Sequence, residues 1–351
     1  MQSPTALLSR SWRRLEARHR SIDSFGAAVH VLDCDAKLSL DEGLLVIERP
    51  GQAAIRLRMA DMRGVCLHGR ASITTPCVQA LLQEGIPLVW RGRTGHYLGQ
   101  TVDMSGQTGQ VRRAQYAAQG SRLALDVGSR LVEAKIANMR AVLRRQGPDG
   151  GILETAAQLA AAARRARHAD DAATLLGVEG AATAAYFARW PALLKGAAAD
   201  MAFPGRQRRP PVGPINALLS YCYAVVAGHC AAAALAAGLD PAEGLLHVNR
   251  PGRPALALDL LEPFRPAVAD SAALFALNTG EIAAADFIAV EDGTRLTDEG
   301  RRKALHALER RLDDAVAKGG SWREEIDRLA HSLSRALRAG SAATLAVPMR
   351  T

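Results

Sequence analysis

The sequence predicts an α+β protein in which a small N-terminal β domain precedes a larger, all-α C-terminal domain. Between residues 29 and 105, short runs of Val, Ile, Leu and Thr are separated by Gly- and Asp-containing turns, which is typical of strands. Over residues 106–351, apolar residues recur with helical spacing. Residues 1–28 form a basic extension in front of both domains.

The β domain is predicted to contain strands of mostly four to seven residues with one helix between them. The helix covers Pro76 to Glu84, where Val78, Leu81 and Leu82 follow i, i+3, i+4 spacing. Trp90 to Tyr97, around RGRTG, predicts a basic hairpin. The predicted strand segments are VHVLD, KLSL, LLVIER, AAIRLRM, GVCLHG, ASITT, IPLVWRG and HYLGQTV.

The α domain is predicted from helical periodicity bounded by Gly, Pro and capping residues. The first helix places Lys135 on its polar side, and Asn216 is a predicted N-cap after Pro214. A helix is predicted to end at Asn278, with no structure assigned to the segment after it, residues 282–295. The other predicted helices cover 110–146, 153–168, 172–190, 216–237, 298–318 and 321–339.

Composition favours a globular protein that acts on a polyanion. Of 351 residues, 48% are hydrophobic, which excludes a disordered chain, and 44 Lys+Arg against 35 Asp+Glu give a net charge of +9. Aromatic residues make up only 4%, too few for a series of base-stacking platforms. Contacts to the backbone of double-stranded DNA are therefore the expected mode of recognition.

Cysteine usage and the N-terminal sequence predict a cytoplasmic protein without a membrane segment. Arg13 and Arg14 are followed by Glu16 rather than by an apolar stretch, so an export signal is not predicted. No run of about 18 uninterrupted apolar residues is found. The cysteines are odd in number and widely spaced, and none form a CxxC pair, which favours a reduced compartment. They are Cys34, Cys66, Cys77, Cys222 and Cys230.

The stretch Gly244–Pro266, GLLHVNRPGRPALALDLLEPFRP, gathers polar side chains in an apolar frame. His247 with Asp259 and Glu262, which are one helical turn apart, makes a mixed N/O ligand set suited to Mn²⁺ or Mg²⁺. The absence of nearby thiols argues against a structural zinc site. A buried histidine with its hydrogen bonds satisfied, next to acids on a solvated helix face, is the competing interpretation.

The same stretch carries arginines and prolines that bear on its chemistry. Arg250 and Arg253 offer planar forks of donors that match phosphate, so a metal beside them indicates phosphodiester chemistry. Pro263 and Pro266 lack the N–H groups that would bond the carbonyls of residues 259 and 262, so the helix is expected to kink or break there.

Glu179 lies on or beside the packing face of its predicted helix, with Leu175, Leu176 and Ala182 as near neighbours. A buried acid needs a partner, and a metal ion or an arginine would each supply one. The Pro/Gly-rich loop Met201–Pro214 is either a substrate-contacting loop or a solvated connector. Its basic residues are Arg206, Arg208 and Arg209.

Taken together, these segments resemble the CRISPR-associated endonuclease and integrase family Cas-one, the first of the numbered Cas proteins. The resemblance covers roughly residues 29–340, with the pieces in the family's order. Those pieces are VEGAATAAYF, RRPPVGPINALLSYCYAVV, AAGLDPAEGLLH, LALDLLEPFRP and LNTGEI, with GIPLVWRGRTGHYLGQ in the β domain.

The resemblance implies a metal-dependent enzyme of spacer acquisition whose helical domain holds the active site. It places the Mg²⁺ or Mn²⁺ ligands on Glu179, His247 and Glu262, with Asp259 as a nearby acid of the site. It also implies a homodimer that pairs through its β domain with a small second adaptation protein, Cas-two. Arg250, Arg253 and Arg265 match basic family positions and are expected to contact DNA or to support the ligands.

Two functions from different classes follow. The first is a DNA endonuclease and integrase that inserts short segments into a repeat array by attack of a 3′-OH on a phosphodiester. The alternative is a catalytically inactive DNA-binding or assembly module. A zinc-dependent hydrolase is disfavoured because the proposed site contains a single histidine.

Overall fold

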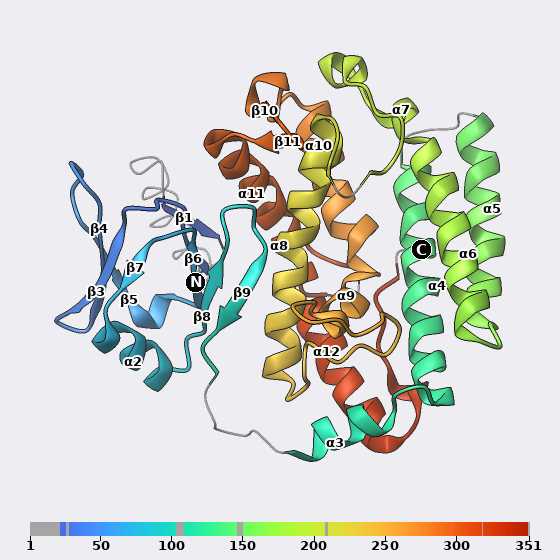
Figure 1. The fold of residues 1–351 in the computed structure, drawn as a ribbon, viewed down its shortest axis with the longest axis horizontal. Helices are drawn as coiled ribbons and strands as arrows, with labels where there is room; N and C mark the ends of the chain where they lie inside the picture. The colour runs from blue at the N-terminus through green and yellow to red at the C-terminus, as the bar shows by residue number, and fades with distance from the viewer. Residues whose placement is uncertain are drawn as a thin grey trace, which may run out of the picture. The chain divides into compact units, whose positions relative to one another are not determined.

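The computed structural model describes residues 22–25, 28–102, 109–145, 150–207, 210–317 and 319–349. Most of the predicted basic extension, residues 1–28, lies outside these residues, as does most of the predicted domain boundary near residue 106. Arg208 and Arg209 also lie outside them. The chain forms two compact units, Met1–Ser105 and Gly106–Thr351, which are described separately below. The predicted α+β class is confirmed, because the first unit is built on strands and the second is mostly helical (Figure 1).

Among its described residues, the first unit has two sheets and one helix, α2 (Thr75–Gln83). One sheet has the order β1-β2-β6-β8-β9 and the other has the order β5-β4-β3-β7. The strands are β1 (Ile22–Phe25), β2 (Ala28–Val31), β3 (Lys37–Asp41), β4 (Leu44–Glu48), β5 (Ile55–Arg58), β6 (Gly64–His68), β7 (Ser72–Ile73), β8 (Leu88–Arg91) and β9 (Tyr97–Gln100).

Period-two patterning explains how these strands share one core. Val29 and Val31 of β2 and Val65 and Leu67 of β6 belong to the apolar core that the two sheets and α2 enclose. Successive strand residues point to opposite faces, so the residues between them face away from this core. The predicted hairpin is confirmed, since β8 and β9 pair antiparallel.

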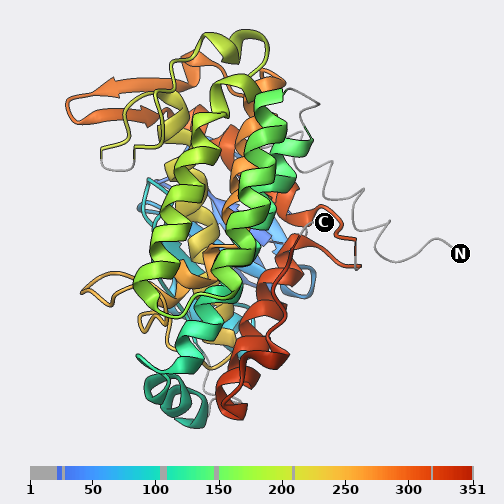
Figure 2. The ribbon, with the colours of Figure 1, turned by 90° about the vertical axis from the view of Figure 1, so that its right-hand side faces the viewer.

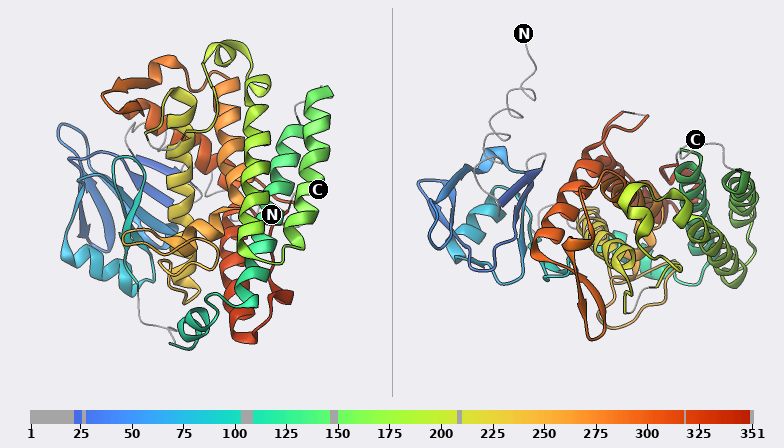
Figure 3. Two further views of the ribbon diagram at one scale, coloured as in Figure 1. Left: turned by 45° about the vertical axis from the view of Figure 1, so that its right-hand side comes forward. Right: turned by 90° about the horizontal axis from the view of Figure 1, so that it is seen from above.

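The second unit is an assembly of long helices around the central helix α8 (Figure 1). Helices α4, α5 and α6 lie side by side in both views of Figure 3, and Figure 2 shows α5 and α6 running along each other. The helices are α3 (Gly109–Ala117), α4 (Arg122–Arg144), α5 (Gly150–Arg167), α6 (Ala172–Ala188), α7 (Trp190–Leu193), α8 (Pro214–Ala236), α9 (Ala255–Leu261), α10 (Ser271–Asn278), α11 (Asp298–Asp313) and α12 (Trp322–Ala339).

Local chemistry changes several predicted boundaries. The single helix predicted over residues 110–146 is two helices, because Gly120 adopts φ +65° and Ser121 caps α4 by accepting a hydrogen bond from the N–H of Ala124. Asn216 is not an N-cap, since α8 begins at Pro214 with Gly213 as its cap.

Residues 282–295, for which no structure was predicted, contribute most of a hairpin. Its strands are β10 (Phe287–Val290) and β11 (Gly293–Leu296), and it extends from the helical unit in Figure 2. The described part of the helical unit also has short 3₁₀ turns at Gly196–Asp200, Ala284–Asp286 and Ala342–Thr344, and the first unit has one at Met59–Asp61.

Helix α8 is the one element, among the described residues, that is long and apolar enough to cross a bilayer by length and composition. The sequence analysis predicted no membrane segment, because Gly228 and His229 interrupt the apolar run of this helix. In the structure, 72% of its most apolar 18-residue window is buried inside the fold, as is typical of a core helix. Its contacts with α9, α11 and α12 and with the segment after α9 place it at the centre of the helical unit.

The helix that follows α9 changes type next to the predicted site. Pro263 and Pro266 cannot donate to the preceding turn, and residues Arg265–Asp270 form a π-helix before α10 begins. The expected irregularity at these prolines is therefore confirmed.

Candidate metal-dependent active site

The structure brings Glu179, His247 and Glu262 together in the helical unit. Lys135 of α4 forms an ion pair with Glu179 Oε1 of α6, and its Nζ lies 2.6 Å from Glu262 Oε2 at the end of α9. His247 Nε2 lies 3.7 Å from Glu262 Oε1. Side chains from four segments therefore converge on one small volume, with the three predicted metal ligands among them.

Glu179 is held at this point by its helix and by a threonine. Asp171 caps α6 by accepting a hydrogen bond from Thr174 N at 2.7 Å, which fixes where the helix starts. One turn beyond Glu179, Thr183 Oγ1 donates to Glu179 Oε1 at 3.0 Å. The sequence analysis gave a metal ion or an arginine as the alternative partners of Glu179. In the structure its charged partner is Lys135.

Asp259 orients the loop that carries His247. Its carboxylate, fully buried, accepts hydrogen bonds from the backbone N–H groups of Leu245 (2.6 Å), Leu246 (3.0 Å) and His247 (2.9 Å). The same carboxylate lies 2.6 Å from His247 Nδ1. Because Nδ1 is engaged, Nε2 is the ring nitrogen directed toward Glu262, which is the arrangement that metal-binding histidines usually have with an outer carboxylate.

Close packing at Gly244 keeps this loop against α9. A Cβ atom added at this position would lie 2.7 Å from the carbonyl oxygen of His247 and 2.8 Å from the Cβ of Ala255. Only glycine lets the loop approach the first turn of α9 closely enough for the backbone N–H groups to reach Asp259.

Glu262 is buried and surrounded by cations. Burial alone would raise the pKa of its carboxyl group, but Arg265, Lys135 and His247 together hold the pKa well below its usual range. Arg265 Nε donates to Glu262 Oε1 at 3.0 Å. Glu262 is therefore ionised at every pH at which the protein would act, as a metal ligand must be.

Lys135 is the site residue that sequence reasoning missed. The prediction placed it on a polar helix face, yet it is only 2% exposed because α4 turns this face toward α9. Asn138, one turn later on the same face, donates to the carbonyl oxygen of Pro263 at 2.8 Å. The available signal was a lysine and an asparagine at i, i+3 spacing inside an otherwise apolar stretch of helix.

A second layer behind Glu262 was also not predicted. The guanidinium of Arg265 lies over the ring of Tyr223, 4.8 Å from its centre. Tyr223 and Tyr186 donate hydrogen bonds from their hydroxyl groups to the carboxylate of Asp270, at 2.6 and 3.1 Å. Burial raises the pKa of Asp270 to about 6, although the two tyrosines and nearby arginines oppose this shift.

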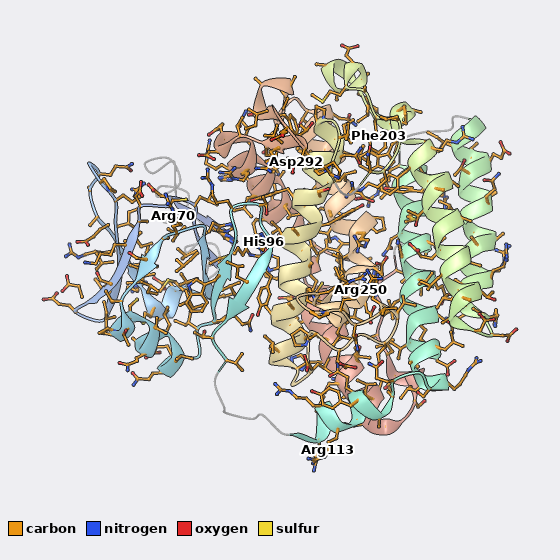
Figure 4. All side chains as sticks on the ribbon, in the orientation of Figure 1. Arg70, His96, Arg113, Phe203, Arg250 and Asp292 are labelled. Carbon is orange, nitrogen blue, oxygen red and sulfur yellow. The ribbon has the colours of Figure 1, made fainter. Side chains whose placement is uncertain are left out.

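The arginines predicted to meet DNA occupy different environments. Arg250 is exposed on the loop before α9, where Figure 4 labels it, and Arg253 is half-buried. Arg265 is buried against Glu262, and Arg206 donates to Asn216 and Ser220, both at 3.0 Å. The remaining pair, Arg208 and Arg209, lies outside the described residues.

The donor set fits a hard divalent cation. It offers carboxylate oxygens from Glu179 and Glu262 and one imidazole nitrogen from His247, a combination that suits Mg²⁺ or Mn²⁺. Glu262 Oε2 is buried, and its close partner is the ammonium group of Lys135, 2.6 Å away. The ammonium group of Lys135 lies between the carboxylates of Glu179 and Glu262, at a position to which both attract a cation.

A protein-family model described as CRISPR associated protein Cas1 matches residues 29–310. The chain belongs to the Cas1 family. It is 42% identical over 284 residues to a CRISPR-associated exonuclease Cas4/endonuclease Cas1 fusion of Rhodospirillum rubrum, an alignment that covers 79% of the chain and 49% of the relative. It is 36% identical over 295 residues to a CRISPR-associated endonuclease Cas1 of the same organism, covering 81% of the chain and 85% of the relative.

Solved structures share the fold of this chain. A CAS1 protein from Thermotoga maritima superposes with a TM-score of 0.76 at 23% identity, over 90% of the chain and 97% of that protein. A casposase bound to integration product gives a TM-score of 0.73 at 22% identity, over 87% and 89%. The chain spans about half the length of the first curated relatives it matches, which are fusion proteins.

Proposed function

We propose that this chain is a divalent-metal-dependent DNA endonuclease and integrase of CRISPR adaptation. The observation that carries the proposal is the convergence of Glu179, His247 and Glu262 around the buried charge of Lys135. Membership of a family whose curated relatives are named endonucleases supports it. The reaction would be attack of a 3′-OH or of water on a phosphodiester of DNA.

The proposed ligands of Mg²⁺ or Mn²⁺ are Glu179, His247 and Glu262. When bound, the cation would offset negative charge on the phosphodiester as it is attacked. Asp259 acts on His247 by fixing the ring so that Nε2 stays directed toward Glu262. Arg265 holds the Glu262 carboxylate from the opposite side, so we assign it to supporting a ligand rather than to contacting DNA.

Basic residues of two loops are proposed to hold the DNA backbone. Arg250 and Arg253 lie on the loop between His247 and α9, so they stand close in sequence to two of the proposed ligands. Arg206, with Arg208 and Arg209 from the same loop, is proposed to add to this charge. Backbone contacts of this kind are independent of base sequence and weaken steeply with salt.

The remaining predicted properties stay part of the same proposal. We propose that the chain acts as a homodimer with Cas-two in the cytoplasm, through the β unit. A solved structure named as a Cas6-RT-Cas1--Cas2 complex has a similar fold, with a TM-score of 0.77 at 24% identity, and is consistent with such a partner. The DNA substrates would be an incoming segment and a repeat array.

The test is a strand-transfer assay with pre-cut DNA, a repeat-bearing plasmid and Mn²⁺. We expect Glu262→Ala and His247→Ala each to abolish joining while leaving the fold and DNA binding in place. Glu154→Ala is the matched control, because this acid is exposed on α5 and accepts a hydrogen bond from the exposed Gln158. Activity that survived both site changes would show that the ligands are wrongly assigned.

The alternative is a catalytically inactive DNA-binding or assembly module. That function predicts a wild-type protein which shifts DNA on a gel with Mn²⁺ but neither cuts nor joins it. The ionised, cation-surrounded Glu262 argues against this alternative, since a DNA-binding role gives no reason to bury a carboxylate.

A further inference from the structure

A second cluster of metal-ligating side chains lies in the β unit, among residues that the proposed function does not use. His30 of β2 and Cys66 and His68 of β6 each place one donor atom within 4.8 Å of the other two. All three residues are buried. They are brought together by the parallel pairing of β2 with β6, in which His30 is the direct partner of Cys66.

The strand pattern explains why these side chains meet. Their neighbours Val29, Val31, Val65 and Leu67 belong to the apolar core. Because strand side chains alternate, His30, Cys66 and His68 share the opposite face of the five-stranded sheet. Donors on adjacent strands of a sheet are held by the backbone, so their spacing is set before any ligand arrives.

Two of the donor–donor distances are close to those of a tetrahedral site. His30 Nδ1 and His68 Nε2 are 3.1 Å apart, and Cys66 Sγ is 3.4 Å from His68 Nε2. With metal–nitrogen bonds of about 2.0–2.1 Å and metal–sulfur bonds of about 2.3 Å, tetrahedral Zn²⁺ separates two nitrogens by roughly 3.3 Å and a nitrogen from sulfur by roughly 3.6 Å. An ion could therefore replace the proton shared by the two imidazoles with shifts of a few tenths of an ångström.

Arg91 of β8 places a positive charge beside the cluster. Its Nε donates to Cys66 Sγ at 3.2 Å, and the thiolate is the form of cysteine that binds metal. The guanidinium also repels a dication, which an anion or hydroxide on the metal would offset. The described residues supply three donors, so a fourth tetrahedral position is left for it.

We propose that His30, Cys66 and His68 bind a borderline-soft transition-metal ion of the Zn²⁺ class, separately from the Mg²⁺ or Mn²⁺ ligands of the helical unit. One thiolate with two imidazoles is a soft donor set that suits Zn²⁺ and Co²⁺ far better than Mg²⁺. The two sites thus differ in chemistry as well as in location, since the proposed catalytic ligands supply only oxygen and imidazole nitrogen.

Cobalt is the probe that separates this site from the other one, because Co²⁺ bonded to a thiolate absorbs in the near ultraviolet and Co²⁺ bonded only to oxygen and imidazole does not. We expect titration of the full chain with Co²⁺ to produce this band and to saturate at about one cobalt per chain. Added Zn²⁺ should remove the band by displacement. A wild-type chain that shows no thiolate band would overturn the proposal without any variant.

Variants then assign the band. Cys66→Ala and His30→Gln should each remove it, with the fold checked by circular dichroism. Cys34→Ser, a partly exposed cysteine of the same unit, and His247→Gln, at the proposed catalytic site, should leave it unchanged. A band that persisted in Cys66→Ala, or vanished in Cys34→Ser, would place the thiolate ligand elsewhere and refute the assignment.

Discussion

Lys135→Met tests whether the buried ammonium group stands in for a bound cation. The substitution keeps the length and volume of the side chain but leaves two carboxylates facing each other. Removing one member of a buried ion pair typically costs about 3–5 kcal/mol. In the variant, Glu262 still pairs with Arg265 at 3.0 Å, and the Glu179 side chain, which is 21% exposed, is still hydrated. Both effects reduce the cost in stability. We therefore expect a value of about 3 kcal/mol in the absence of metal.

Mn²⁺ should restore much of this loss. A ligand that binds only the folded state stabilises it by about 2.7 kcal/mol at a concentration of 100 times its Kd. In the wild type, Lys135 competes with Mn²⁺ for Glu179 and Glu262, whereas in the variant it does not. The gain in stability on adding Mn²⁺ should thus be larger for Lys135→Met than for the wild type.

The assay is urea unfolding of both proteins in EDTA and in Mn²⁺, followed by the helical circular dichroism signal. Lys303→Met is the matched control, because Lys303 pairs with Asp286 at 2.8 Å in the same unit but far from the ligands in sequence. This control should lose stability without any dependence on Mn²⁺. Equal gains for Lys135→Met and the wild type would refute the idea that lysine and metal share one position.

Three further outcomes follow from the structure. Asp259→Asn should lower strand transfer by about 10–100-fold, measured as initial rates, because the amide cannot accept from three N–H groups and still orient His247. The free energy of unfolding of the wild type, measured relative to that of Asp270→Asn, should fall by about 1.4 kcal/mol between about pH 5 and about pH 7.5. The reason is that the pKa of Asp270 is about 6 in the folded protein, above its unfolded value, so ionisation of this group in that range destabilises the fold. Equal pH dependence of unfolding in the two proteins would contradict this. Arg250→Ala with Arg253→Ala should reduce the slope of log affinity against log salt by about 2, and an unchanged slope would exclude both from the DNA contact.

The proposed ligands could be identified from the sequence because each stands out in its own segment. His247, Asp259 and Glu262 share one short stretch, and Glu179 interrupts an apolar helix face. The different roles of Asp259 and Glu262 could not be predicted, since they depend on which loop atoms reach Asp259. Asp259 accepts backbone N–H groups, whereas Glu262 faces the cations.

Other features depend on contacts that no local pattern encodes. Lys135 has the sequence surroundings of a solvated helical lysine, and it is buried by the packing of α6 and α9 against α4. His30 and Cys66 are far apart in sequence and become neighbours through parallel strand pairing, whose register cannot be read from either strand alone. The strand and helix positions were predictable where apolar periodicity was strong, and they failed where Gly120 interrupts a continuous helical pattern.

The π-helix at Arg265–Asp270 has a further consequence for the evolution and engineering of the chain. A π-turn holds one residue more than an α-turn, so it behaves as a single-residue insertion that the helix has absorbed. Deleting one residue there would restore ordinary α-helical winding, and the residues between the deletion and the end of the π-helix would move by one position, about 100° around the helix axis. Arg265 or Asp270 would then leave the side of the helix that faces Glu262 and Tyr223. A change in the length of this segment should consequently disturb the site even when Arg265 and Asp270 are both retained.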